Sequence, residues 1–157
     1  MRQPKHLKHY LGVDPGKNGG LCVLRSDGTP LVWDRMPIGK VRIIDWLLKT
    51  KEQYWNLILV AELAQSMPKQ GVTSCFRYGQ HFATFEDAAI MMKIPYHEVR
   101  PAVWKKSFGL TSNKIDSTTA SRKIFPSVGL IPIGCRKEHD GIAEALLIAE
   151  WARRKDL

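Results

Sequence analysis

Four acidic residues of this chain stand where apolar segments begin or end. Asp14 closes one such segment just before a Pro-Gly pair, and Glu62 closes the apolar run LILVA. Asp140 and Glu144 are four residues apart, a spacing that places both on one face of a helix. Carboxylates held close together repel one another, and a divalent cation between them removes the conflict. Carboxylate oxygens are ligands that Mg²⁺ prefers, and two such ions can activate water and stabilise the leaving oxygen in phosphodiester cleavage. The pattern therefore predicts that these four residues are the metal ligands and catalytic groups of a site for two Mg²⁺ ions, in which Mn²⁺ can substitute.

Each of the four acids also has a purely structural interpretation. Asp14 could be a turn former before Pro-Gly, and Asp140 could be an acid that stabilises a helix N-terminus. Glu144 could lie on a solvated helix face. Glu62 is harder to explain in this way, because an ionised glutamate is rarely buried without a partner. The hypothesis of a metal site depends on the joint placement of the four residues; Glu150, further along the same segment, is expected at the surface.

Composition limits the class of protein. The 157 residues are about one domain's worth, and 44% are hydrophobic, so we expect a single domain over 1–157 with a real core. Lys and Arg number 24 against 15 Asp and Glu, a net charge of +9 that favours a polyanionic partner, nucleic acid before an acidic membrane surface. No apolar run approaches the roughly 20 residues of a membrane span, and no secretory signal is visible. Three widely spaced cysteines are expected to pack in the interior of a cytoplasmic, DNA-associated protein.

The pattern of apolar residues predicts an α/β protein. Short strands joined by Gly-containing turns indicate an antiparallel meander, and the apolar run before Glu62 is typical of a strand covered on both faces. If the strands that end at Asp14 and Glu62 are parallel neighbours, both carboxylates emerge at the same edge of the sheet. The expected order is βββ-α-β-α-β-α-α, a mixed β-sheet flanked by helices. We expect strands at 6–14, 21–26, 30–36, 56–62 and 96–104, and helices at 40–53, 75–93, 114–125 and 139–157.

The segments LGVDPGKNGGLCVL, AELAQSMPKQGVTSCFRYGQ, RPAVWKKSFGL and HDGIAEALLIA resemble the RuvC family of Holliday-junction resolvases, in particular its phage- and plastid-type branch. The resemblance covers most of the chain. It implies an RNase H-like fold and two Mg²⁺ ions bound by Asp14, Glu62, Asp140 and Glu144. Two features differ from the bacterial proteins, which generally space the last two acids by three residues and use two aspartates. Glu138 and His139 adjoin Asp140, and His139 could ligate metal, position water or simply cap the helix.

The residues around the acidic set are candidates for DNA contacts. Basic residues could hold phosphates, and aromatic residues next to a cleavage site could stack on an unpaired base or wedge into a step. In the resembled family, aromatics in the segment after Glu62 probe the junction centre, and lysines of the later glycine loop contact phosphates. The alternatives are that the aromatics begin the core face of a helix and that the lysines only aid solubility. The candidates are Lys17, Lys69, Phe76, Arg77, Tyr78, Lys105, Lys106 and Lys114.

The resemblance implies a Mg²⁺-dependent endonuclease that resolves four-way DNA junctions by paired symmetric nicks. A four-way junction has near two-fold symmetry, which favours a homodimer with two matched sites. The expected helix at 75–93 has more apolar residues than one core face requires, among them Phe82, Phe85, Ala89, Met91 and Met92, and could supply part of the dimer interface. Two alternatives remain open: a nuclease acting on other branched DNA or structured RNA, and a module that binds junctions without cutting.

Overall fold

A computed structural model describes residues 7–63, 65, 69 and 71–157 of the chain. Five strands form one sheet in the order β3-β2-β1-β4-β5. The first three form the predicted antiparallel meander, whereas β4 and β5 continue the sheet parallel to β1. The strands are β1 (His9–Asp14), β2 (Gly20–Arg25), β3 (Pro30–Arg35), β4 (Leu57–Glu62) and β5 (Tyr96–Val99).

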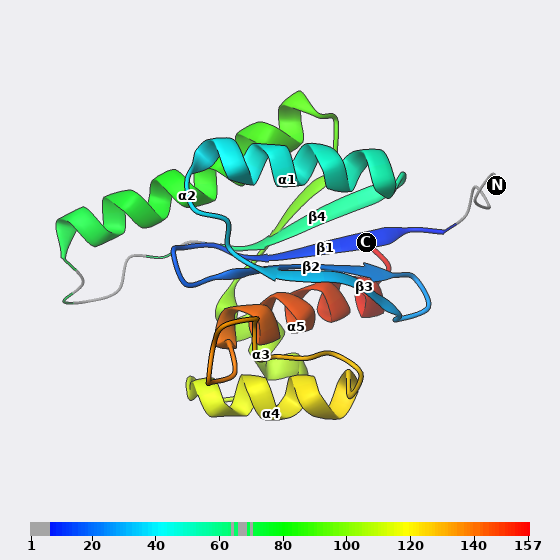
Figure 1. The fold of residues 1–157 in the computed structure, drawn as a ribbon, viewed down its shortest axis with the longest axis vertical. Coiled ribbons are helices and arrows are strands. Elements are labelled where there is room, and N and C mark those ends of the chain that lie inside the picture. The colour runs from blue at the N-terminus through cyan, green and yellow to red at the C-terminus, as the bar shows by residue number, and fades with distance from the viewer. Residues whose placement is uncertain (1–6, 64, 66–68, 70) are drawn as a thin grey trace.

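Helices cover both faces of this sheet (Figure 1). On one face lie α1 (Lys40–Gln53) and α2 (Val72–Met91), and on the other α5 (Asp140–Lys155) packs directly on the strands. Beneath α5 lie α3 (Pro101–Ser107) and α4 (Lys114–Ile124) (Figure 1). Every residue of β4 is buried, as expected for a strand with helices on both sides.

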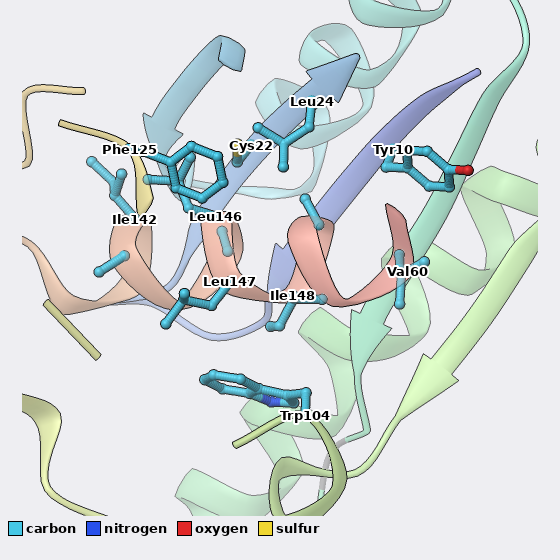
Figure 2. Close-up of a cluster of buried hydrophobic side chains, with 14 of the residues drawn as sticks. Tyr10, Cys22, Leu24, Val60, Trp104, Phe125, Ile142, Leu146, Leu147 and Ile148 are labelled. Carbon is cyan, nitrogen blue, oxygen red and sulfur yellow. The ribbon is translucent and has the colours of Figure 1, made fainter. Parts of the chain in front are cut away.

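The helix α5 is buried almost all the way round, because it is enclosed between the sheet and the helices below it. Figure 2 shows its Leu146, Leu147 and Ile148 between the sheet and Trp104. The contact with the sheet is close. A Cβ built on Gly12 of β1 would lie 2.1 Å from the carbonyl oxygen of Ala145, so the absence of a side chain at this position sets the spacing between strand and helix.

The second half of the chain differs from the sequence prediction at one element. The segment 96–104 was expected to be a single strand, but β5 ends at Val99 and α3 begins at Pro101. Proline suits the first position of a helix, where its missing N–H is not needed and its fixed φ is already helical. The three helices after β5 therefore replace the two that were expected.

The helix α2 is only half anchored in the core. Its buried residues Thr84, Phe85, Ala88 and Ala89 all belong to the C-terminal half. The N-terminal half extends past the edge of the sheet (Figure 1). Part of the apolar surplus noted for this helix is thus core packing, since Phe85, Ala89 and Met92 are buried, whereas Met91 is 83% exposed.

Two smaller expectations concern cysteines and membranes. Cys22 is buried, Cys75 and Cys135 are partly buried, and no disulfide joins any of the three within the described part of the chain. Among the described residues, no helix combines the length and apolarity needed to cross a membrane.

Candidate functional site

The parallel pairing of β1 with β4 places two of the acids side by side. Val13 is in register with Ala61, so Asp14 and Glu62 are the next residues at the same edge of the sheet. Both strands end there, and the chain after β1 turns sharply through Gly16, whose φ of 109° is one that glycine adopts readily. The conditional expectation from the sequence, that these strands are parallel neighbours, is confirmed.

The N-terminus of α5 is held against the same edge. Gly19 and Gly141 form an isolated parallel bridge between the turn after β1 and the first turn of the helix. A Cβ on Gly20 would approach the Gly141 carbonyl oxygen to 2.5 Å, so only a backbone without side chains permits this contact. Asp140 immediately precedes Gly141, and Glu144 follows one turn later, which brings both acids toward Asp14.

Two of the carboxylates are held by specific donors. The indole Nε1 of Trp104 donates a hydrogen bond of 2.7 Å to Oε2 of Glu62, and this pair is buried. Oε1 of Glu144 accepts a hydrogen bond of 3.1 Å from Ser117 and lies 3.2 Å from the ammonium Nζ of Lys105. Each contact uses one oxygen of its carboxylate, so the second oxygen of Glu62 and of Glu144 is not part of them. Glu144 is therefore part of a polar network, which contradicts the alternative interpretation that it lies on a solvated helix face.

The acids influence one another electrostatically. Burial, followed by the negative charges of Glu144, Glu62 and Asp140, raises the pKa of Asp14 well above its ordinary value. Burial and Glu144 likewise raise the pKa of Glu62, although the hydrogen bond from Trp104 opposes the shift. The positive charge of Lys105 opposes the rise at both carboxyls. The edge of the sheet is thus a place where negative charge is concentrated and partly compensated by Lys105.

The chemistry of these groups fits a divalent cation. Four carboxylates contribute hard oxygen donors, and a cation would relieve the repulsion that raises the pKa of Asp14. Within the described part of the chain, however, no three Asp, Glu, His or Cys side chains are gathered closely enough to form a ready-made ligand cage. Lys105 supplies part of the compensating charge in this arrangement.

The other candidates near Asp140 have structural partners. His139 is the N-cap of α5, and its Nδ1 accepts a hydrogen bond of 3.2 Å from the backbone N–H of Ile142. Glu138 lies 3.3 Å from a guanidinium nitrogen of Arg122. Glu150 was expected at the surface, but this prediction is wrong: the residue is 2% exposed. Its carboxylate is held by Arg153 and Arg154, both at 2.7 Å, which makes its burial tolerable.

The two aromatic candidates on α2 differ in their burial. Tyr78 packs against Gly16, where a Cβ would come within 3.1 Å of its ring, and is partly buried. Burial and the charges of Asp14, Glu62 and Glu144 raise the pKa of its phenol, so the hydroxyl stays protonated. Phe76 is 66% exposed and therefore does not begin the core face of the helix.

Among the basic candidates, one contacts a carboxylate of the site and four are exposed. Lys105 lies within the carboxylate cluster, whereas Lys17, Lys69, Arg77 and Lys106 are exposed. Lys114 begins α4, and its side chain lies outside the described part of the structure.

Two residues of the site were not singled out from the sequence. Trp104 was assigned to the end of a strand and treated only as a neighbour of Lys105, and Ser117 was one of several hydroxyls in an expected helix. Recognising that a helix begins at Pro101 would have placed Trp104 and Lys105 about one helical turn after its start, just beyond the strand. Nothing in the local pattern distinguishes Ser117 from its neighbours.

Comparisons with known proteins bear on the fold. Protein-family models and curated proteins give no match to the sequence. Among solved structures, the chain is similar to Thermus thermophilus RuvC in one structure (TM-score 0.68, 18% identity) and to the same protein in complex with a Holliday junction substrate (0.67, 16%). Each alignment covers 94% of this chain and 96% of the other. The large terminase nuclease of the thermophilic phage G20c is also similar (0.54, 16%), over 93% of this chain and 82% of that one. At these identities the likeness concerns the fold alone: the chain has the RNase H-like α/β fold that the resemblance in its sequence implied.

Proposed function

We propose that this protein is a metal-dependent, structure-selective endonuclease that resolves four-way DNA junctions. The observation that carries the proposal is the convergence of Asp14, Glu62, Asp140 and Glu144 at one edge of an RNase H-like sheet. A protein that only bound phosphates would gain nothing from concentrating negative charge beside DNA. The carboxylates therefore favour a nuclease over a binding module.

The residues have distinct roles in this proposal. Asp14, Glu62, Asp140 and Glu144 would hold Mg²⁺, which when bound supplies a nucleophilic water and stabilises charge on the leaving oxygen. Trp104 orients Glu62 through its indole N–H, and Ser117 orients Glu144. Lys105 partly neutralises the cluster, and its ammonium lies where it could also attract the phosphate of the strand to be cut. Tyr78, held against Gly16, would place an aromatic ring and a neutral hydroxyl beside that phosphate.

The choice of substrate rests on two supports. A net charge of +9 favours a nucleic-acid partner, and one of the similar structures is a RuvC bound to a Holliday junction. A duplex or another branched substrate is the alternative, since the same fold serves a terminase nuclease. Structured RNA is a further alternative substrate. We infer that the enzyme acts in a reducing compartment that contains DNA.

Paired nicks require two sites, so we propose a homodimer. The exposed apolar residues Val72, Phe76, Ile90 and Met91 of α2 are available for such a dimer interface. Light scattering coupled to gel filtration, with and without a four-way junction, tests this point. A monomer in both conditions would contradict the dimer while leaving the nuclease assignment intact.

The decisive experiment is a nicking assay on a mobile four-way junction with Mg²⁺. Wild type should cut two strands at symmetric positions, and Glu62→Gln should lose cleavage by at least about 100-fold, because a ligand of the reacting site is removed. Asp14→Asn should also lose cleavage but keep junction binding. Glu52→Gln, an exposed position on α1, is the matched control and should cut like wild type.

A panel of substrates tests the specificity. The four-way junction, a flap, a fork, plain duplex and structured RNA are compared at equal concentration. Preference for RNA, or equal cutting of plain duplex, would overturn the junction-resolving assignment. Loss of cleavage and binding together in Asp14→Asn would count against the metal-site assignment.

A further inference from the structure

We propose that a basic trough beside the carboxylates holds the phosphate backbone of a nucleic-acid strand, an inference that rests on the proposed nuclease function and extends it. The trough consists of two adjoining hollows around the turn after β1 and the loop that leads into α1. Neither α1 nor the end of β3 contributed a residue to the nucleic-acid contacts expected from the sequence.

The two hollows form one continuous surface. The first encloses about 600 Å³ between the turn after β1, the end of β3 and one face of α1. The second encloses about 710 Å³ between the same turn, the loop before α1 and the N-terminal half of α2. They share Lys17, Asn18, Pro37 and Ile38, so a ligand can pass from one to the other across these residues.

The charge of the trough suits a polyanion. The two hollows are lined by six Lys or Arg residues and by two acids, Asp34 and Asp45. With histidines neutral, the lining therefore has a net charge of +4. None of the six basic side chains forms an ion pair within the part of the chain that the structure describes, so their charge remains available to a ligand. These six are Lys17, Arg35, Lys40, Arg42, Lys49 and Arg77.

The helix α1 presents its part of the trough in a regular way. Arg42, Trp46 and Lys49 follow one another at spacings of four and three residues, which aligns them along one face. Trp46 is partly buried between two exposed cations. A phosphate backbone lying along this face would meet a cation at each turn, and the indole would offer a flat surface to a sugar or an unpaired base.

Both hollows adjoin the carboxylate site. Tyr78 lines the second hollow and packs on Gly16, two residues after Asp14. His139 lines the first hollow and directly precedes Asp140. A strand held in the trough would thus run past the acids. This placement addresses a physical difficulty of the site, because a cluster of carboxylates repels DNA unless positive charge nearby compensates.

Salt-dependent DNA binding without cleavage tests the trough directly. Arg42→Gln/Lys49→Gln removes two charges from the face of α1, and Lys123→Gln/Lys155→Gln removes two exposed charges elsewhere as the matched control. Affinity for labelled four-way junction, duplex and single strand is measured by fluorescence anisotropy in EDTA over a range of salt concentrations. If both residues contact phosphates, the slope of log K against log salt falls in magnitude by about 1.8 with duplex or by about 1.4 with single strand. The form of nucleic acid whose slope falls by its full value is the one held in the trough.

The outcomes separate the trough from the proposed function. Equal slopes for the trough variant and the control would overturn the inference, even if wild type resolves junctions. A reduced slope in a protein that cuts no branched DNA would support the trough and contradict the resolvase assignment.

A second measurement covers the case in which the double variant does not fold. A photo-crosslinking residue at Ile38, 80% exposed and shared by both hollows, should capture labelled DNA. The same residue at Ile90, 68% exposed near the other end of α2, should not. Equal capture at the two positions would also contradict the trough.

Discussion

Adding one methyl group at Gly12 should disturb both the stability and the activity of this protein. In Gly12→Ala, the new Cβ would lie 2.1 Å from the Ala145 carbonyl oxygen, 2.6 Å from the Ala149 nitrogen and 2.9 Å from its Cβ. Ordinary contact begins near 3.4 Å, so α5 must move about 1.3 Å away from β1. Two of the three atoms are helix backbone, which cannot turn aside as a side chain would.

The expected magnitudes follow from this displacement. Overpacking of this kind costs about 1–3 kcal/mol, and in a domain of this size each kcal/mol lowers Tm by about 2–4 °C. The same shift carries Asp140 and Glu144 away from Asp14. Because a misplacement of about 1 Å at a reacting centre can cost roughly 100-fold in rate, junction cleavage should fall by about that factor.

A matched substitution separates this effect from glycine replacement in general. Gly79 lies within α2, and a Cβ there would meet nothing within 4 Å. Gly79→Ala should therefore raise stability by about 0.5–1 kcal/mol through its better helix propensity, with cleavage unchanged. Thermal unfolding by circular dichroism and single-turnover cleavage measure the two properties. If Gly12→Ala unfolds and cuts like wild type, the close strand–helix contact does not position the acids.

Three further predictions concern the acids and their partners. Because the pKa of Asp14 is raised, the folded protein binds a proton more tightly than the unfolded chain, and its stability falls as pH rises above 3.8 through that raised pKa. At neutral pH in EDTA, Asp14→Asn should therefore have a higher Tm than wild type. Added Mg²⁺ should raise the Tm of wild type only. Trp104→Phe leaves Glu62 without its indole donor and should cost about 1–3 kcal/mol in urea unfolding. A double-mutant cycle with Glu62→Leu, which removes the acceptor, should show non-additivity, whereas full additivity would mean that the hydrogen bond contributes nothing. Burial opposes ionisation of Glu150, but hydrogen bonds from the two neighbouring arginines prevail and lower its pKa. The stability that this carboxylate contributes is therefore present above pH 4.5 and lost as pH falls through the lowered pKa. Glu150→Gln should cost about 1–3 kcal/mol at pH 7 and less at pH 3, and an equal loss at both pH values would refute this assignment.

Local patterns in the sequence were sufficient for most of the elements. The helix α1 occupies the predicted range 40–53, and the all-apolar run before Glu62 is the buried parallel strand that its composition indicated. Periodicity and turn residues act over a few positions, so they are readable without the fold. Where the expectation failed, after Val99, the proline at 101 has two local meanings: it favours extended backbone before it and a helix after it. The sequence prediction did not include the helix that begins at this proline.

The sequence by itself determined the chemical inventory: four carboxylates at the ends of elements, a positive surplus and a βββ-α-β beginning. Tertiary structure decided which of these groups meet. The pairing of β1 with β4 and the contact of Gly12 with Ala145 join residues more than forty positions apart, and no local pattern specifies such contacts. The tertiary structure also brought Lys105 onto Glu144, buried Glu150 with its arginines, and placed α1 beside the turn after β1, where the first hollow lies.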